Sequence, residues 1–227
     1  MNLLHKLLLW LACAICAVPA MAARDWTRTV AATPEGGYLI GNPKAPVKVI
    51  EYFSLTCSHC RHFAETGMVP LKAGYVAKGK VSLELRNFVL NAPDFSASLL
   101  MRCGSPAQAV KLFDQAFAAQ EELFKGAYTL SQDAIGRINA VPMEQRPSAL
   151  AREAGIDKWF IAKGVSAKQA AACFADAKRS DALVDLRKVA ATKLNVQGTP
   201  AFLVNGTLVD GTGWENLEPA IVKALGG

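Results

Sequence analysis

The sequence has no block rich in lysine and arginine, and no basic stripe that alternates with aromatic residues. Its formal net charge of +6 is modest for 227 residues. Both features argue against nucleic acid as a partner. Internal repeats and low-complexity tracts are also absent, and 52% of the residues are hydrophobic while 19% are charged. This composition is typical of a globular protein with a substantial apolar core.

Long apolar runs are scarce, and the clearest one covers residues 7–18. Lys6 precedes this run, and residues 20–22 read Ala-Met-Ala, which is a small-x-small cleavage site. The run is shorter than the roughly 20 residues of a spanning helix, so a cleaved signal peptide is favoured over a membrane anchor. We therefore expect residues 1–22 to be removed on export. The net charge then falls from +6 to +5, because Lys6 is the one charged residue lost.

Cysteine is sparse beyond the expected cleavage site, with Cys57, Cys60, Cys103 and Cys173 remaining. An exported chain meets an oxidising compartment, where disulfides form and persist. Four cysteines allow three pairings. Pairing the close residues Cys57 and Cys60 leaves Cys103 with Cys173. The alternative to that second bond is a pair of free cysteines buried in a core.

The hydrophobic pattern predicts strands near both ends of the chain beyond residue 22. Residues 47–53 are β-branched and aromatic, as in a buried strand, and residues 81–88 alternate between apolar and polar. Asn205-Gly206 is a favoured hairpin turn, and it joins two predicted short strands, residues 201–204 and 207–210. By contrast, residues 23–37 have no clear pattern and are expected to form an irregular lead-in.

Helical patterns fill most of the chain between those strands. One helix is expected from Ser58 to about Ala73, and another at residues 214–225. The stretch from 96 to 193 is rich in Ala, Gln, Lys and Leu and has little strand signal, so it should form several helices. We expect these to break near Gly104, Gly126, Pro142, Pro147 and Gly164. The predicted fold class is therefore α/β, with residues 23–95 and 194–227 forming one discontinuous domain and 96–193 a helical insertion.

The tetrapeptide Cys57-Ser58-His59-Cys60 carries the clearest chemistry. It follows a predicted strand and begins a predicted helix, where unpaired N–H groups and the positive end of the helix dipole stabilise a thiolate. A protonated His59 would add positive charge. Cys60, one turn into the helix, should be more shielded. We therefore interpret Cys57 as the attacking thiol and Cys60 as the resolving thiol of a redox centre.

A metal site is the alternative interpretation of these residues. Tetrahedral zinc needs four nitrogen or sulfur ligands, and Cys57, Cys60, His59 and His62 could supply them. However, four ligands at one helix start would converge poorly. The sequence therefore favours redox chemistry with no metal and no cofactor beyond the disulfide itself.

Two further positions have both a structural and a functional interpretation. Glu51 interrupts the apolar strand six residues before Cys57. It could be an edge residue in solvent, or a buried acid that exchanges protons with Cys60. Gly198-Thr199-Pro200 precedes the hairpin, where proline could simply begin a strand or could follow a cis peptide bond.

Two segments together resemble the DsbA-type thiol–disulfide oxidoreductases. Residues 51–60, Glu-Tyr-Phe-Ser-Leu-Thr-Cys-Ser-His-Cys, are similar to the family's active-site segment. Residues 198–206, Gly-Thr-Pro-Ala-Phe-Leu-Val-Asn-Gly, look like its cis-proline loop and hairpin. The order and spacing match along nearly the whole chain beyond residue 22. The resemblance implies a thioredoxin fold with an inserted all-helical domain.

The resemblance also implies an activity and partners. It implies a periplasmic, monomeric enzyme that donates the Cys57–Cys60 disulfide to reduced exported proteins. A membrane quinone-linked, DsbB-like oxidase would then reoxidise it. The resemblance favours the buried-acid role for Glu51, a cis bond before Pro200 with Thr199 presenting its backbone to substrate, and an extra Cys103–Cys173 pair as in some branches.

The sequence departs from the family pattern at two positions. Ser58 stands where the best-known members have proline, and Thr199 is a residue also found there in disulfide isomerases. Both departures keep a reductase or isomerase activity open as the alternative to oxidation.

Overall fold

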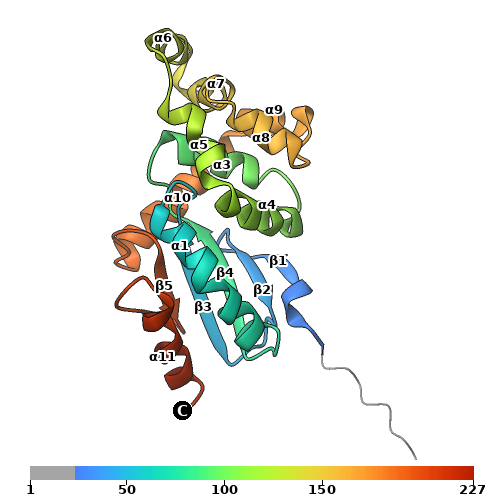
Figure 1. Ribbon diagram of the computed structural model, residues 1–227, viewed down its shortest axis with the longest axis vertical. Coiled ribbons are helices and arrows are strands. Elements are labelled where there is room, and N and C mark those ends of the chain that lie inside the picture. The colour runs from blue at the N-terminus through green and yellow to red at the C-terminus, as the bar shows by residue number, and fades with distance from the viewer. Residues whose placement is uncertain (1–23) are drawn as a thin grey trace, which may run out of the picture.

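The fold comes from a computed structural model, which describes residues 24–227. The expected signal peptide, residues 1–22, lies outside the described residues. Figure 1 shows the sheet with α1 and α11 towards one end of the molecule, and helices α3 to α9 gathered at the other.

A six-stranded mixed sheet has the order β1-β2-β4-β3-β5-β6. The central strand β3 pairs in parallel with β4 and antiparallel with β5, and β2 runs antiparallel to β4. The strand bounds are β1 Val30–Ala32, β2 Tyr38–Gly41, β3 Val47–Phe53, β4 Val81–Asn87, β5 Ala201–Val204 and β6 Thr207–Leu208.

The helices fall into two groups along the chain. Those that accompany the strands are η2 (Trp26–Arg28), α1 (Ser58–Thr66), α2 (Met68–Leu71), the π-helical turn η3 (Lys72–Val76) and α11 (Trp214–Ala224). Those between β4 and β5, here called the helical segment, are α3 (Ala92–Met101), α4 (Pro106–Ala118), α5 (Gln120–Tyr128), α6 (Gln132–Ala140), η4 (Met143–Gln145), α7 (Arg146–Glu153), α8 (Ile156–Ala162), α9 (Ala167–Ala175) and α10 (Ala177–Lys193).

One apolar core joins the sheet to the helical segment. Phe53 on β3 packs edge to face against Phe113 of α4, with ring centroids 4.8 Å apart, and Phe113 packs in the same way against Phe117. Phe63 of α1 packs against Phe202 of β5, and their ring centroids are 4.4 Å apart. The Phe53 contact attaches α4 to β3, and the Phe63 contact attaches α1 to β5. The boundaries predicted for the helical insertion, at residues 96 and 193, stay predictions. Helix α3 extends across the one at residue 96.

The expectation of an irregular lead-in is wrong. Val30 pairs with Ile40, and Tyr38 pairs with Leu85, so residues 30–41 add a hairpin to the edge of the sheet. These strands are only three and four residues long, and Gly36 makes the turn with a φ of +87°. Their stability comes from pairing with β4, which local periodicity cannot reveal.

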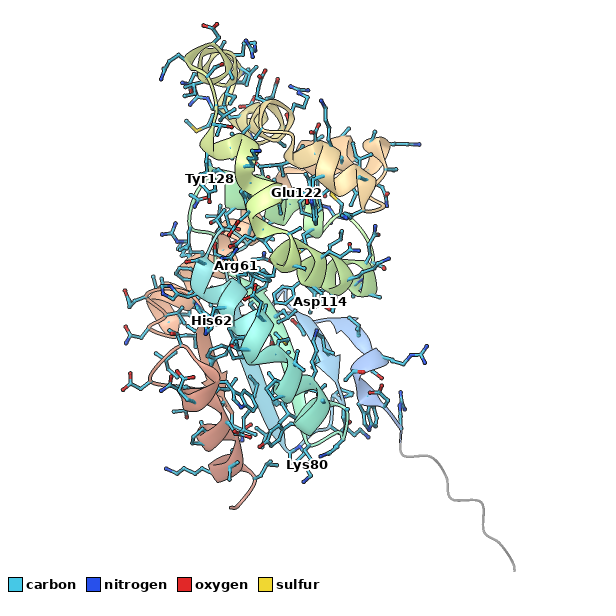
Figure 2. The ribbon with its side chains drawn as sticks, viewed as in Figure 1. Arg61, His62, Lys80, Asp114, Glu122 and Tyr128 are labelled. Carbon is cyan, nitrogen blue, oxygen red and sulfur yellow. A yellow bond between two sulfur atoms is a disulfide. The ribbon has the colours of Figure 1, made fainter. Side chains whose placement is uncertain are left out.

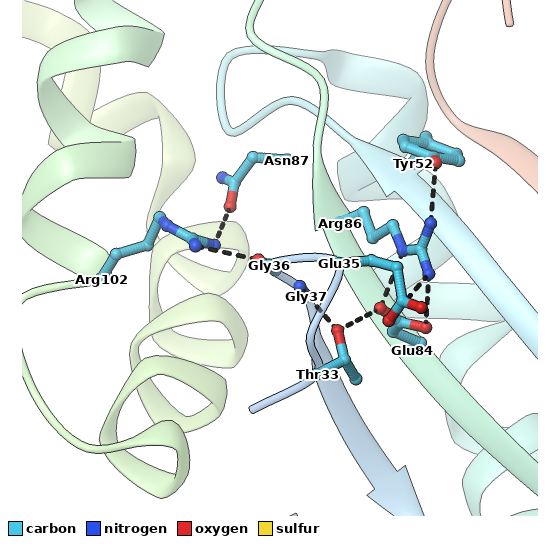
Figure 3. Close-up of polar contacts among 9 residues, drawn as sticks. All are labelled: Thr33, Glu35, Gly36, Gly37, Tyr52, Glu84, Arg86, Asn87 and Arg102. Atoms are coloured by element: carbon cyan, nitrogen blue, oxygen red, sulfur yellow. Dashed lines mark hydrogen bonds and ion pairs between the residues drawn. The ribbon is translucent and has the colours of Figure 1, made fainter. Parts of the chain in front are cut away.

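β4 is buried on both faces, contrary to the alternation that its sequence suggested. Arg86 is 8% exposed, and its guanidinium donates to both carboxylate oxygens of Glu84, at 2.7 and 2.9 Å, and to the Tyr52 hydroxyl at 3.2 Å (Figure 3). Thr33 in the turn before β2 donates to the same Glu84 carboxylate. Buried polar side chains are therefore tolerated in β4 because Glu84 and Arg86 form hydrogen bonds with each other, and Thr33 of the added hairpin donates to Glu84.

The helix break predicted near Gly126 falls just after it, because α5 ends at Tyr128 and α6 begins at Gln132. Gly126 lies within α5, where a Cβ atom would collide with the backbone carbonyl of Ala154. The glycine therefore permits close packing of α5 against the end of α7 and does not end a helix. The turn at Asn205-Gly206 behaves as predicted, with φ values of +48° and +84°.

Candidate functional site

The two thiols of the tetrapeptide lie where β3 leads into α1. Cys57 is the N-cap residue of α1, and its backbone N–H donates to the Ser54 carbonyl at 3.2 Å. The Cys57 side chain is partly exposed, whereas Cys60 is fully buried. Both cysteines are free thiols in the structure. One sulfur is thus reachable from outside, and its neighbour is shielded.

The surroundings separate the acidities of these thiols. A hydrogen bond from the Cys60 thiol is the main cause that lowers the Cys57 pKa to about 5, against the opposing effect of burial. Contact with Thr199 and the backbone N–H groups of Cys60 and His59 lower it further. Burial is the main cause that raises the Cys60 pKa well above its usual value, and the Cys57 contact and Glu51 add to it. Near neutral pH the exposed sulfur is therefore a thiolate and the buried one a thiol.

The Gly198-Thr199-Pro200 loop faces the exposed sulfur. The Thr199–Pro200 peptide bond is cis, which is the conformation that the resemblance implied. The Cys57 Sγ lies 3.2 Å from the Thr199 carbonyl oxygen, to which the protonated thiol donates. Pro200 is buried, and β5 begins at the next residue. Residues 142 positions apart in the sequence thus form one site.

Glu51 is fully buried, so the interpretation as a solvent-facing edge residue is wrong. Its strand, β3, lies between β4 and β5. Within residues 24–227, neither carboxylate oxygen has a hydrogen-bond partner. Burial raises the Glu51 pKa to about 8, while the Lys72 ammonium, which pairs with Asp114 at 2.9 Å, acts to lower it. Because Glu51 also raises the Cys60 pKa, the structure couples the acid to the buried thiol.

The histidines of the tetrapeptide region point to solvent. His59 and His62 are both exposed on α1, and Figure 2 shows His62 beside Arg61 on that helix. His59 lowers the Cys57 pKa through its backbone N–H, whereas the sequence suggested that a protonated imidazole would do so. Within the described part of the chain, no group of three or more His, Cys, Asp or Glu side chains is placed to hold a metal ion.

Sequence reasoning missed the side chains that hold the loop from Ser54 to Cys57. Asp94 on α3 is fully buried, and its carboxylate accepts from the backbone N–H of Leu55 at 3.0 Å and of Leu90 at 2.9 Å. Gln120 on α5 donates to the carbonyls of Leu55 and Cys57. Asp94, three residues after the N-cap Asn91, resembled ordinary helix capping, and Gln120 carried no local signal at all.

Cys103 and Cys173 form a disulfide with an S–S distance of 2.05 Å and a sequence separation of 70 residues. Cys103 follows the end of α3, and Cys173 is a buried residue of α9. The bond therefore crosslinks the helical segment, away from the Cys57–Cys60 pair in sequence.

Comparison with known proteins places these features in a family. A family model described as thioredoxin matches residues 33–223, and the chain belongs to this family. A Rickettsia prowazekii protein, assigned by name to the protein-disulfide oxidoreductases, is 26% identical over 82% of this chain and 61% of its own length. A Bacillus cereus protein, named for disulfide bond formation, is 27% identical over 82% of this chain and 77% of its own length. The chain thus spans about three fifths of the Rickettsia relative.

Solved structures agree with the fold. The protein-disulfide isomerase from Novosphingobium aromaticivorans is 28% identical, with a TM-score of 0.77, over 83% of this chain and 97% of its own. Wolbachia pipientis alpha-DsbA1 is 22% identical, with a TM-score of 0.65, over 84% of this chain and 91% of its own. The predicted thioredoxin fold with helices inserted between its strands is thereby confirmed. Among residues 24–227, no helix has the length and apolar character needed to cross a membrane.

Proposed function

We propose that this protein is a thiol–disulfide oxidoreductase that donates a Cys57–Cys60 disulfide to reduced exported proteins. One observation carries the proposal: a partly exposed sulfur with a pKa of about 5 sits beside a buried thiol whose pKa is raised. A cysteine that is stable as a thiolate is a good leaving group, and it stabilises the reduced form of the pair. Such a pair favours giving its disulfide away.

The exchange follows from these positions. A substrate thiolate attacks the exposed Cys57 sulfur, the Cys57–Cys60 bond breaks, and Cys60 leaves and takes up a proton. A second substrate thiolate then attacks the substrate sulfur of the mixed disulfide, and Cys57 leaves as a stable thiolate. The substrate loses two electrons and two protons. The protein gains both electrons, Cys60 takes up one proton, and the other proton passes to solvent because Cys57 stays a thiolate. Glu51, protonated below about pH 8, is the proton donor and acceptor for Cys60.

The cis-proline loop has a positioning role in this scheme. Pro200 has no backbone N–H, so it leaves the sulfurs free of a competing donor. The Thr199 carbonyl, 3.2 Å from Cys57 Sγ, presents a backbone edge beside the reacting atom. We assign Cys57 as nucleophile, Cys60 as resolving thiol, and Thr199, Pro200, His59 and Glu51 as supporting residues. The Cys103–Cys173 bond is assigned a structural role.

Turnover requires a two-electron oxidant for the Cys57–Cys60 dithiol. We propose a membrane quinone-linked, DsbB-like oxidase, and a periplasmic location after cleavage of residues 1–22. The name of the Bacillus cereus relative, which refers to disulfide bond formation, supports this direction.

The test is oxidation of a reduced peptide that contains two cysteines. The oxidised protein should convert about one equivalent of peptide to its disulfide, while Cys57 and Cys60 become reduced, as read by thiol alkylation and mass spectrometry. The Cys57→Ala protein should convert none. An oxidised wild-type protein that leaves the peptide reduced would refute the proposal.

Isomerase activity is the second candidate, because one observation favours it. The Novosphingobium structure, 28% identical to this chain, is named a protein-disulfide isomerase. Recovery of activity by a scrambled disulfide protein, with the Cys57–Cys60 pair reduced, measures this function. Rapid reshuffling together with poor peptide oxidation would favour the isomerase.

A further inference from the structure

Gln120 connects the helical segment to the loop that carries Cys57. It is the first residue of α5 and is 8% exposed. Its side-chain Nε2 donates to the Leu55 carbonyl at 2.8 Å and to the Cys57 carbonyl at 2.9 Å. A primary amide has two N–H groups, and both are used here on carbonyls that flank Thr56.

Leu55 depends on the helical segment for both of its backbone hydrogen bonds. Its N–H donates to the Asp94 carboxylate, and Gln120 is the one donor found for its carbonyl among the described residues. Leu55 itself is fully buried, so water cannot replace either partner. Losing the amide would leave a buried carbonyl unpaired, and the turn would have to move to satisfy it.

The Cys57 carbonyl has a second donor, the backbone N–H of Arg61 at 3.1 Å in the first turn of α1. The Gln120 bond therefore adds to a helical bond and fixes the orientation of the peptide unit that begins α1. The N–H groups that face the Cys57 sulfur, those of His59 and Cys60, follow directly from that peptide unit. Tilting it would move these donors away from the sulfur.

We propose that Gln120 is a positioning residue for the redox centre. Its amide clamps the Leu55 and Cys57 carbonyls, and this keeps the Cys57 sulfur at the start of α1 and against the Thr199 carbonyl. The inference rests on the proposed function, which it deepens by tying the reactivity of Cys57 to the helical segment. Gln120 touches no reacting atom, so its effect passes entirely through the loop from Ser54 to Cys57.

The test replaces the amide with an apolar group of the same length and uses a matched control. Gln120→Met removes both donors and keeps the volume and the helix propensity. Gln108 also donates a side-chain N–H to a backbone carbonyl, that of Gly164 at 3.0 Å, but within the helical segment and nearer the surface. Gln108→Met therefore removes a comparable bond far from the loop.

Two readouts respond to positioning and not to general destabilisation. One is the pKa of Cys57 in the reduced protein, followed by the ultraviolet absorbance of the thiolate. The other is the equilibrium of the Cys57–Cys60 disulfide with glutathione. Gln120→Met should raise the Cys57 pKa by at least about half a unit. It should also shift the equilibrium towards the disulfide by at least about threefold, since one pKa unit is a factor of ten.

The outcomes separate the inference from the proposed function. Gln108→Met should leave both readouts unchanged. A folded Gln120→Met protein with wild-type values, or an equal shift in Gln108→Met, overturns the positioning role. Gln120→Asn, whose amide is one methylene too short, is judged by the same criteria if the methionine variant does not fold. Failure of both to fold also overturns it, because Gln120 is then a folding residue. A wild-type protein that does not oxidise the peptide refutes the proposed function instead.

Discussion

The low pKa of Cys57 makes the stability of the reduced protein depend on pH. The folded pKa of about 5 lies below the unfolded value of about 8.5. The unfolded chain therefore binds more protons in this interval, and the reduced protein gains stability as pH rises. The contribution is fully present above the unfolded pKa and is lost as pH falls through about 5. Oxidation abolishes it, because a disulfide does not titrate.

The size of the effect follows from the distance between pH 7 and the folded pKa. These differ by about two units, and each unit corresponds to about 1.4 kcal/mol, which gives an upper value of about 2.8 kcal/mol. Cys57 is partly exposed, so solvent screens the interactions of its thiolate. We therefore expect the free energy of unfolding of the reduced protein, relative to the oxidised protein, to rise by about 2 kcal/mol between pH 4 and pH 7.

Urea unfolding of both redox forms at a series of pH values measures this difference. The experiment needs the Cys103→Ala/Cys173→Ala background, so that reduction affects the Cys57–Cys60 pair alone. Glu51 titrates above this window in the folded protein and is present in both forms, so its contribution largely cancels. A difference that stays constant from pH 4 to pH 7, or that falls, would refute the assignment of a stabilised Cys57 thiolate.

Three further predictions concern the cysteines and Glu51. Cys60→Ala should accumulate mixed disulfides through Cys57 on non-reducing gels, because the resolving thiol is absent, and equal trapping by Cys57→Ala would contradict the assignment. Glu51→Gln should raise the free energy of unfolding by about 3 kcal/mol at pH 7. Burial keeps Glu51 protonated in the folded wild-type protein, and the free energy lost in this way grows as the pH rises from about 4.5 to 8. Thermal unfolding at pH 5 and pH 7 checks this, and a gain that does not increase with pH argues against the buried acid. Cys103→Ala/Cys173→Ala should lose up to about 4 kcal/mol in denaturant unfolding and keep peptide oxidation, because the bond closes a long loop outside the redox pair.

The parts of the fold that local pattern determines were predictable from the sequence. Residues 47–53 form β3 with the predicted bounds, and the Asn205-Gly206 turn joins β5 to β6. Cys57 and Cys60 were identified because a strand, a short loop and a helix start are adjacent in the chain. These features depend on neighbours within about four residues, which sequence patterns record directly.

The remaining features depend on contacts between distant segments. The β1–β2 hairpin is stabilised by pairing with β4, and its own residues have little strand pattern. Burial of Glu51 could not be decided until the sheet order placed β3 between two neighbours. Gln120 lies 63 residues from Cys57, so nothing near it indicates a contact with the redox loop. Tertiary pairing, which periodicity does not encode, determines all three.

The equilibrium of the Cys57–Cys60 pair with glutathione tests the central claim most directly. The oxidised and reduced fractions, quantified by alkylation and mass spectrometry across a series of glutathione ratios, give the reduction potential of the pair. The low pKa of Cys57 predicts an oxidising couple, nearer the value of about −120 mV for DsbA than the value of about −270 mV for thioredoxin. A potential at or below the thioredoxin value would contradict the account, because such a pair would withdraw disulfides from its substrates.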